Sequence, residues 1–105
     1  MKGRLYQIVL STPMGKRNGQ LCLCECDNML TGYLDILQHR NEIENGNIVK
    51  GVYTFSGELV TLVRNIAFIA VGRADNNSVS FHIKADHMEM HLSGSRISDW
   101  DGLNE

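Results

Sequence analysis

Residues 79–92 alternate apolar and polar side chains through two consecutive stretches. The apolar positions of this segment are Val79, Phe81, Ile83, Met88, Met90 and Leu92. A period of two is typical of β-strands, because successive side chains of a strand point to opposite faces of the sheet. A turn at Ala85-Asp86 would fold the segment into an antiparallel hairpin with one apolar face. The pattern therefore predicts a core built from the inner faces of paired strands.

The other face of this hairpin carries histidines and a carboxylate. The turn at Ala85-Asp86 predicts three opposed pairs: His82 with Glu89, Lys84 with His87, and Ser80 with His91. Imidazole and carboxylate groups bind metals and transfer protons, so His82, His87, Glu89 and His91 are candidates for either chemistry. A solvated outer surface is the favoured interpretation, because polar alternation is normal on the outside of a sheet. No metal is therefore expected.

Similar segments recur along the rest of the chain. Strands are predicted for residues 4–11, 20–26, 29–36, 48–55 and 59–72 and for the hairpin, whose return strand extends to residue 97. Turns and loops are predicted for residues 12–19, 27–28, 38–47, 56–58 and 75–77. Residues 59–72 also fit a helical apolar stripe, but their β-branched side chains favour a strand that bends near Asn65.

About seven or eight short strands without a convincing helix indicate an all-β fold, either a sandwich or a barrel. A small antiparallel up-and-down barrel with little or no helix is the first choice, because closure removes exposed sheet edges. Residues 1–97 are predicted to form this single domain. Residues 98–105 are predicted to be a flexible acidic tail.

The hairpin of residues 20–36, with its turn at Asp27-Asn28, is predicted to gather its leucines on one face. In this register Leu23 meets Gly32, and Leu21 meets Leu34. The opposite face carries cysteines beside Met29 and Tyr33 and is less polar than a solvated surface. A homo-oligomer is therefore expected to form through Cys22, Cys24, Met29 and Tyr33. The cysteines lack the second pair that a structural zinc site needs.

Glu25 lies on the leucine face of that hairpin by strict alternation. A carboxylate there requires either a position at the barrel rim or a buried partner. The rim is the favoured position. If Glu25 pointed into a cavity instead, it would be the polar anchor for a ligand, with Arg96 or Tyr6 as its partner.

Several short motifs carry a resemblance to a known kind of domain: Thr12-Pro13-Met14-Gly15, Gly19-Gln20-Leu21-Cys22-Leu23, Leu30-Thr31-Gly32, Gly51-Val52-Tyr53-Thr54-Phe55 and Leu92-Ser93-Gly94-Ser95-Arg96. With them the chain resembles small uncharacterised bacterial barrel domains with a calycin-like, lipocalin-like meander. The resemblance implies a barrel that holds a small apolar or amphipathic ligand. The residues expected to line the lumen or its rim are Tyr6, Leu23, Glu25, Tyr53, Phe55, Phe68, Met90 and Arg96.

Composition narrows the classes of partner. A chain of 105 residues can bury one modest core. Ten Lys and Arg against twelve Asp and Glu leave a net charge of −2, which disfavours nucleic-acid binding. A membrane-spanning helix needs about 18 consecutive apolar residues, and no such run occurs, so no membrane partner is expected. Three closely spaced cysteines favour reduced thiols and the cytoplasm over a secreted disulfide scaffold.

No part of the sequence combines a nucleophile with a base and oxyanion donors, or supplies a complete metal shell. No catalytic residue and no cofactor are therefore expected. The first hypothesis is a non-enzymatic module that binds a small ligand. The alternative is a structural or interaction protein acting as a homo-oligomer, and a histidine-based metal or acid–base enzyme ranks third.

Overall fold

The computed structural model describes residues 2–101, with side chains from Gly3 to Ile97. Within this range every regular element is a strand. The strands are β1 (Lys2–Thr12), β2 (Gly15–Cys26), β3 (Met29–Ile36), β4 (His39–Glu42), β5 (Glu44–Val49), β6 (Val52–Val60), β7 (Asn65–Ala74), β8 (Ser78–Ala85) and β9 (Met88–Asp101).

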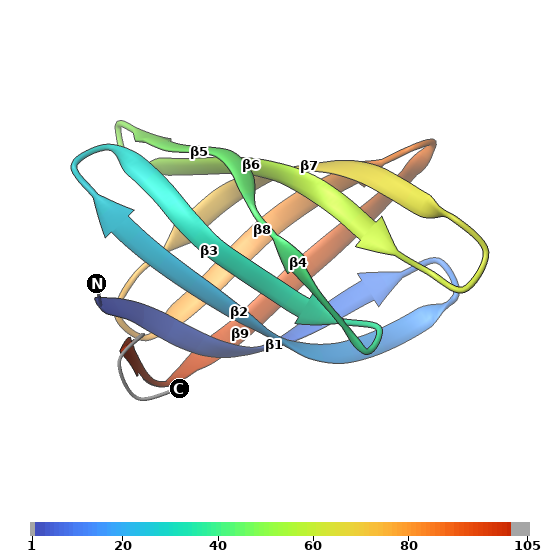
Figure 1. The fold of residues 1–105 in the computed structure, drawn as a ribbon, viewed down its shortest axis with the longest axis horizontal. Helices are drawn as coiled ribbons and strands as arrows, with labels where there is room; N and C mark the ends of the chain where they lie inside the picture. The colour runs from blue at the N-terminus through green and yellow to red at the C-terminus, as the bar shows by residue number, and fades with distance from the viewer. Residues whose placement is uncertain (1, 102–105) are drawn as a thin grey trace.

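The strands close into one antiparallel barrel. Their order is β2-β1-β9-β8-β7-β6-β5-β3-β4, and an additional pairing of β2 with β3 joins the two sides of the sheet. Eight strands form the closed wall, and the short β4 is an extra strand (Figure 1). It pairs with the second half of β3, whereas β5 pairs with the beginning of β3. Closure leaves the wall without a long free edge. The predicted small up-and-down barrel is therefore confirmed.

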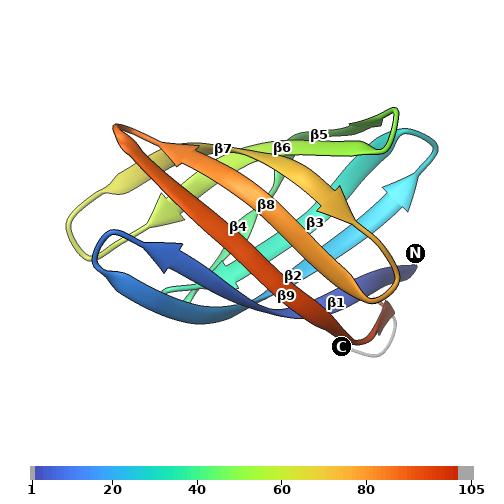
Figure 2. The same cartoon turned by 180° about the vertical axis from the view of Figure 1, so that it is seen from behind.

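The turns of the meander gather at two ends of the barrel. Both termini lie at one end, which we name the terminal end, together with the turns at residues 27–28, 50–51 and 75–77 (Figures 1 and 2). The opposite end, named the far end, carries the turns at residues 13–14, 37–38, 61–64 and 86–87. Each inward-pointing residue therefore lies at a defined height between these ends.

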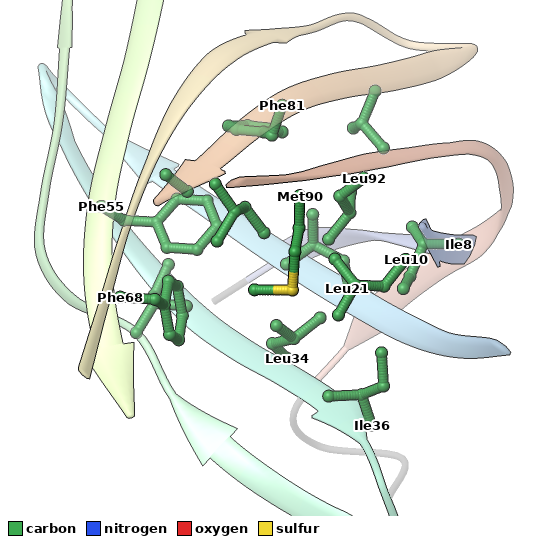
Figure 3. Packing of buried hydrophobic residues seen from close by; sticks show 14 of the residues in the cluster. Ile8, Leu10, Leu21, Leu34, Ile36, Phe55, Phe68, Phe81, Met90 and Leu92 are labelled. Carbon is green, nitrogen blue, oxygen red and sulfur yellow. The ribbon is translucent and has the colours of Figure 1, made fainter. Parts of the chain in front are cut away.

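The inward-pointing side chains pack against one another inside the barrel (Figure 3). Three phenylalanines meet edge to face: the ring centroids of Phe55 and Phe81 are 5.2 Å apart, and those of Phe55 and Phe68 are 6.0 Å apart. Burying one large apolar side chain contributes about 1.5–3 kcal/mol to folding. An eight-stranded barrel is just wide enough for side chains to fill it, and the buried, inward-pointing side chains of this chain form one cluster inside it. The interior is therefore a packed core.

The register predicted for the second hairpin is confirmed. Leu21 pairs with Leu34, and Leu23 pairs with Gly32, across the turn at Asp27-Asn28. All three leucines are buried in the core. The agreement arises because this hairpin is local and a one-residue slip would turn its leucines outward.

Two predicted loops are wrong. Residues 12–19 form only a two-residue turn, Pro13-Met14, and β2 begins at Gly15. Residues 38–47 form β4 and most of β5, with a break in the register between Glu44 and Asn47. Most side chains of these strands are polar, and in β4 the buried residue, Asn41, is polar as well, so no period of two is visible. Backbone pairing with neighbouring strands, which a polar side chain does not prevent, decides their structure.

Two further boundaries are also wrong. The strand predicted for residues 48–55 is divided by a turn at Lys50-Gly51, where both residues have positive φ. The break predicted at residues 56–58 is absent, and β6 continues to Val60. The strand reading of residues 59–72 is confirmed over helix, although a four-residue turn at 61–64 interrupts it close to the predicted bend.

The hairpin of β8 and β9 has a different register from the predicted one. Its turn lies at Asp86-His87, one residue later than expected, and Asp86 adopts a φ of 60°. His82 consequently pairs with His91, and Lys84 pairs with Glu89. The apolar face is unaffected, because the shift moves each pairing by two residues. Strand β9 continues to Asp101 beside β1, and residues 102–105 of the expected tail lie outside the described residues.

Candidate functional site

Most of the residues expected to line a ligand lie in the packed core. They are Tyr6, Leu23, Tyr53, Phe55, Phe68 and Met90, and each is at most 8% exposed. Their side chains belong to one cluster of mutually packed residues, in which Phe55, Phe68 and Met90 lie close together (Figure 3). These side chains contact one another, so they occupy the space inside the barrel that a ligand would need.

Glu25 lies at the rim of the terminal end, as favoured from the sequence. Its carboxylate accepts a hydrogen bond from the Tyr53 hydroxyl at 2.6 Å and forms an ion pair with the Arg4 guanidinium. The partners suggested from the sequence, Tyr6 and Arg96, lie elsewhere in the same rim. Tyr6 donates to the backbone carbonyl of Asp75 at 2.6 Å, and Arg96 donates to that of Asn76 at 3.3 Å.

The rim groups hold the turn between β7 and β8 against the end of the barrel. Burial raises the pKa of the Tyr6 phenol, and Arg4 and Arg96 only partly oppose this effect. Tyr6 therefore remains a neutral hydrogen-bond donor at physiological pH. Hydrogen bonds from the backbone N–H groups of Asn77 and Ser78 hold the pKa of the Asp75 carboxyl below its usual range. Each of these interactions is satisfied within the chain, so these groups hold the rim together.

The cysteine face is covered within a single chain. Cys22 and Cys24 are buried, at 0% and 3% exposure, and they pack with Tyr33 and Leu5 on the outside of the barrel. Strand β1 approaches closely here, since a Cβ at Gly3 would lie 2.5 Å from the Cys24 sulfur. The Arg40 guanidinium covers the Tyr33 ring at 3.8 Å. Of the residues expected at an interface, only Met29 is largely exposed.

This burial predicts which thiols react. In the native protein we expect one of the three cysteines, Cys26, to react rapidly with a thiol reagent, because it alone is exposed. The other two should react only after denaturation. Mass spectrometry of the briefly labelled protein measures this directly, and Cys26→Ser should leave almost no fast reaction. Rapid labelling of Cys22 or Cys24 in the folded protein would contradict the packing.

The histidine face is exposed, and its side chains make only a few contacts with one another. His82 Nε2 lies 2.8 Å from Glu89 Oε1, and His91 Nε2 lies 3.4 Å from the Ser80 hydroxyl. His87 is at the turn with a fully exposed side chain. Among the described residues, no three His, Cys, Asp or Glu side chains are arranged to hold a metal ion. The structure therefore places these residues on a solvated wall, in a register different from the expected one.

A hollow that the sequence interpretation missed lies on the outer wall of β1, β2 and β3, toward the far end. Its volume is about 280 Å³, and its lining residues are Gln7, Asn18, Gly19, Gln20, Asp35, Ile36, Leu37 and Gln38. We name it the amide hollow. The register explains its composition, because Gln7 pairs with Gln20 and Gln20 with Asp35 across three neighbouring strands.

Four side chains of the amide hollow are carboxamides that have no hydrogen-bond partner among the described residues. Within the described part of the chain, the carboxamides of Gln7, Asn18, Gln20 and Gln38 make no side-chain hydrogen bond. The only carboxylate, that of Asp35, lies 3.7 Å from the Arg40 guanidinium. Four groups that can each donate and accept hydrogen bonds therefore face one open volume.

The rim of the amide hollow has an unusual backbone. Leu37 and Gln38 form the turn between β3 and β4, with φ values of 57° and 62°. Two successive non-glycine residues in the left-handed region are rare, and each costs roughly 1–2 kcal/mol. Neither residue is of a type that signals such a turn. This part of the site was missed because residues 12–19 and 38–47, which supply three of its lining residues, were interpreted as loops.

Comparison with known proteins identifies no relatives. No protein family matches the chain, and neither the curated proteins nor the solved structures contain a significant match. In the described residues no helix is long and apolar enough to cross a membrane. Inferences about function therefore depend on the geometry of the barrel and its surface.

Proposed function

We propose that the protein is a non-enzymatic binding module that holds a small, neutral, polyhydroxylated ligand of the carbohydrate class in the amide hollow. The observation that carries the proposal is the set of four uncommitted carboxamides around a volume of about 280 Å³. A volume of this size is near the lower limit of small-molecule sites, roughly 300 Å³. It suits a monosaccharide or part of a disaccharide.

The chemistry of the lining selects the ligand class. Carboxamides donate and accept at once, which complements hydroxyl groups, since these also do both. The lining contains no lysine or arginine, so an anionic ligand gains no ion pair there. Leu37, which is exposed, offers apolar surface to the C–H face of a sugar ring. The expected small apolar ligand is less well supported, because the core side chains occupy the barrel interior.

Two wider expectations belong to this proposal. The up-and-down order of the strands supports a relationship to calycin-like barrels. The bacterial origin of the chain stays a prediction. The three free thiols support a reducing compartment, the cytoplasm.

Titration of the isotope-labelled protein with glucose, N-acetylglucosamine and maltose tests the proposal. Amide resonances of residues 18–20 and 35–38 should shift together, with a dissociation constant in the region of 1–10 mM, because an open site forms few hydrogen bonds. Glucuronate should bind more weakly than glucose, since it would meet the Asp35 carboxylate.

Gln20→Ala should weaken binding severalfold, because Gln20 lies between Gln7 and Asp35 in the row of paired residues across β1, β2 and β3. Asn65→Ala removes an exposed carboxamide at the start of β7 and is the matched control, with no expected effect. The proposal is wrong if none of the three sugars shifts these resonances, or if Gln20→Ala binds as the unchanged protein does.

A further inference from the structure

An apolar strip runs along the outer wall of β5, β6 and β7. Val49, Ile69 and Val71 are 61%, 56% and 44% exposed, and Val52 and Thr54 beside them are half-buried. The strands bring them together, since Val49 pairs with Val52 and Thr54 pairs with Val71. Several adjacent exposed aliphatic side chains are typical of a contact surface, in contrast to single scattered ones.

Charges of opposite sign border this strip on its two sides. One register row across four strands consists of Glu44, Ser56, Ile69 and Lys84. It begins with a carboxylate on β5 and ends with an ammonium group on β8. Both end residues are exposed, and neither forms an ion pair among the described residues. The neighbouring row is Asn47, Thr54, Val71 and His82, with its aliphatic residue again near the middle.

This arrangement is complementary to itself. A two-fold axis lying in the contact plane, between β6 and β7 and parallel to them, places each row against its own reverse. Glu44 then faces Lys84 of the second copy, while Ile69 faces Ser56 and Val71 faces Thr54. We propose that a second copy of this chain docks on the β5–β8 wall and forms a symmetric dimer. Opposite charges at the two edges set the register, and the apolar strip supplies the contact between them.

The cysteine face cannot take this role, because Cys22, Cys24 and Tyr33 are already buried within one chain. The amide hollow lies on a different part of the barrel wall, on β1, β2 and β3. Dimer formation through the β5–β8 wall would therefore leave it open. The dimer proposal and the ligand proposal depend on different residues and can fail separately.

Sedimentation velocity over a concentration series tests the dimer. The unchanged chain should approach dimer mass with rising concentration, and Val71→Asp should weaken association at least tenfold by placing a charge in the strip. Leu62→Asp is the matched control, since Leu62 is a fully exposed aliphatic residue in the far-end turn, outside the wall. It should leave association unchanged, and far-ultraviolet circular dichroism should confirm that every variant is folded.

A charge exchange tests the proposed symmetry. Lys84→Glu and Glu44→Lys should each weaken the dimer, because each places like charges in contact at both edges. The double variant, Glu44→Lys with Lys84→Glu, should restore it. The proposal would be overturned if the protein without substitutions stayed monomeric at high concentration. It would also be overturned by dissociation with Leu62→Asp but not with Val71→Asp, or by a double variant as monomeric as the single ones.

Discussion

Replacing Gly32 with alanine is expected to lower the free energy of unfolding by about 4 kcal/mol or more. Gly32 lies in β3 with a φ of 140°, a region that residues with a Cβ rarely adopt. A methyl group there would overlap the carbonyl oxygen of Cys22 and lie 2.9 Å from its carbonyl carbon. The obstacle is backbone, which no side-chain rotation relieves. Since domains of this size are stable by only about 5–15 kcal/mol, the variant should lose a large fraction of its stability.

Gly51→Ala is the matched control for Gly32→Ala. Gly51 also has a positive φ, 79°, but its Cβ would meet only a terminal nitrogen of Arg73, at 3.4 Å. Alanine should cost only about 1–2 kcal/mol at this position, because backbone strain is its main penalty. Urea denaturation of both variants measures the difference. Equal losses would show that the close approach of β2 and β3 at Gly32 does not limit stability.

Phe81→Ala is expected to lower the free energy of unfolding by about 3–5 kcal/mol. Phe81 is fully buried, and its ring centroid lies 5.2 Å from that of Phe55 and 6.5 Å from that of Tyr53. Removing the ring discards these contacts and opens a cavity inside a closed wall that cannot collapse freely. Urea denaturation should show a lower midpoint with an unchanged slope.

The same variant tests whether the lumen is filled. Benzene should stabilise Phe81→Ala and leave the unchanged protein unaffected, because only the variant has apolar space for it. Phe81→Leu, which keeps most of the volume, should cost less than about 1.5 kcal/mol. A loss below about 1 kcal/mol for Phe81→Ala, or stabilisation of the unchanged protein by benzene, would contradict the packed interior.

The features that could be predicted are those encoded by neighbouring residues. Alternation in residues 79–92 predicts a hairpin with an apolar face, and that face is buried in the structure except for the half-buried Met88. The register of the second hairpin followed from placing Leu21, Leu23 and Leu34 together, because any slip would expose them. The rim position of Glu25 followed from a carboxylate at the end of a leucine face. Each of these inferences needed only one hairpin.

The features that could not be predicted either lack a local sequence signal or depend on more than one hairpin. The turn at Leu37-Gln38 lacks glycine, asparagine and aspartate, and the pairing of β3 with β4 imposes it. The amide hollow is formed by β1, β2 and β3 together with that turn, so no single segment of the sequence predicts it. The sequence predicts that the cysteines are exposed, because the hairpin alone cannot show that Leu5 and Gly3 of β1 cover them.

The sequence by itself determined that this chain forms an all-β antiparallel fold and favoured a barrel, because a period of two and frequent turns leave few other ways to bury its apolar residues. It also determined which side chains face inward in the two hairpins of residues 20–36 and 79–92. The tertiary structure alone decided how the outer surface is divided: a covered cysteine face, a polar hollow and an apolar wall with charged edges. Alternation specifies only inward or outward for each residue, whereas the neighbours of an outward side chain depend on which strands the barrel closure places beside it.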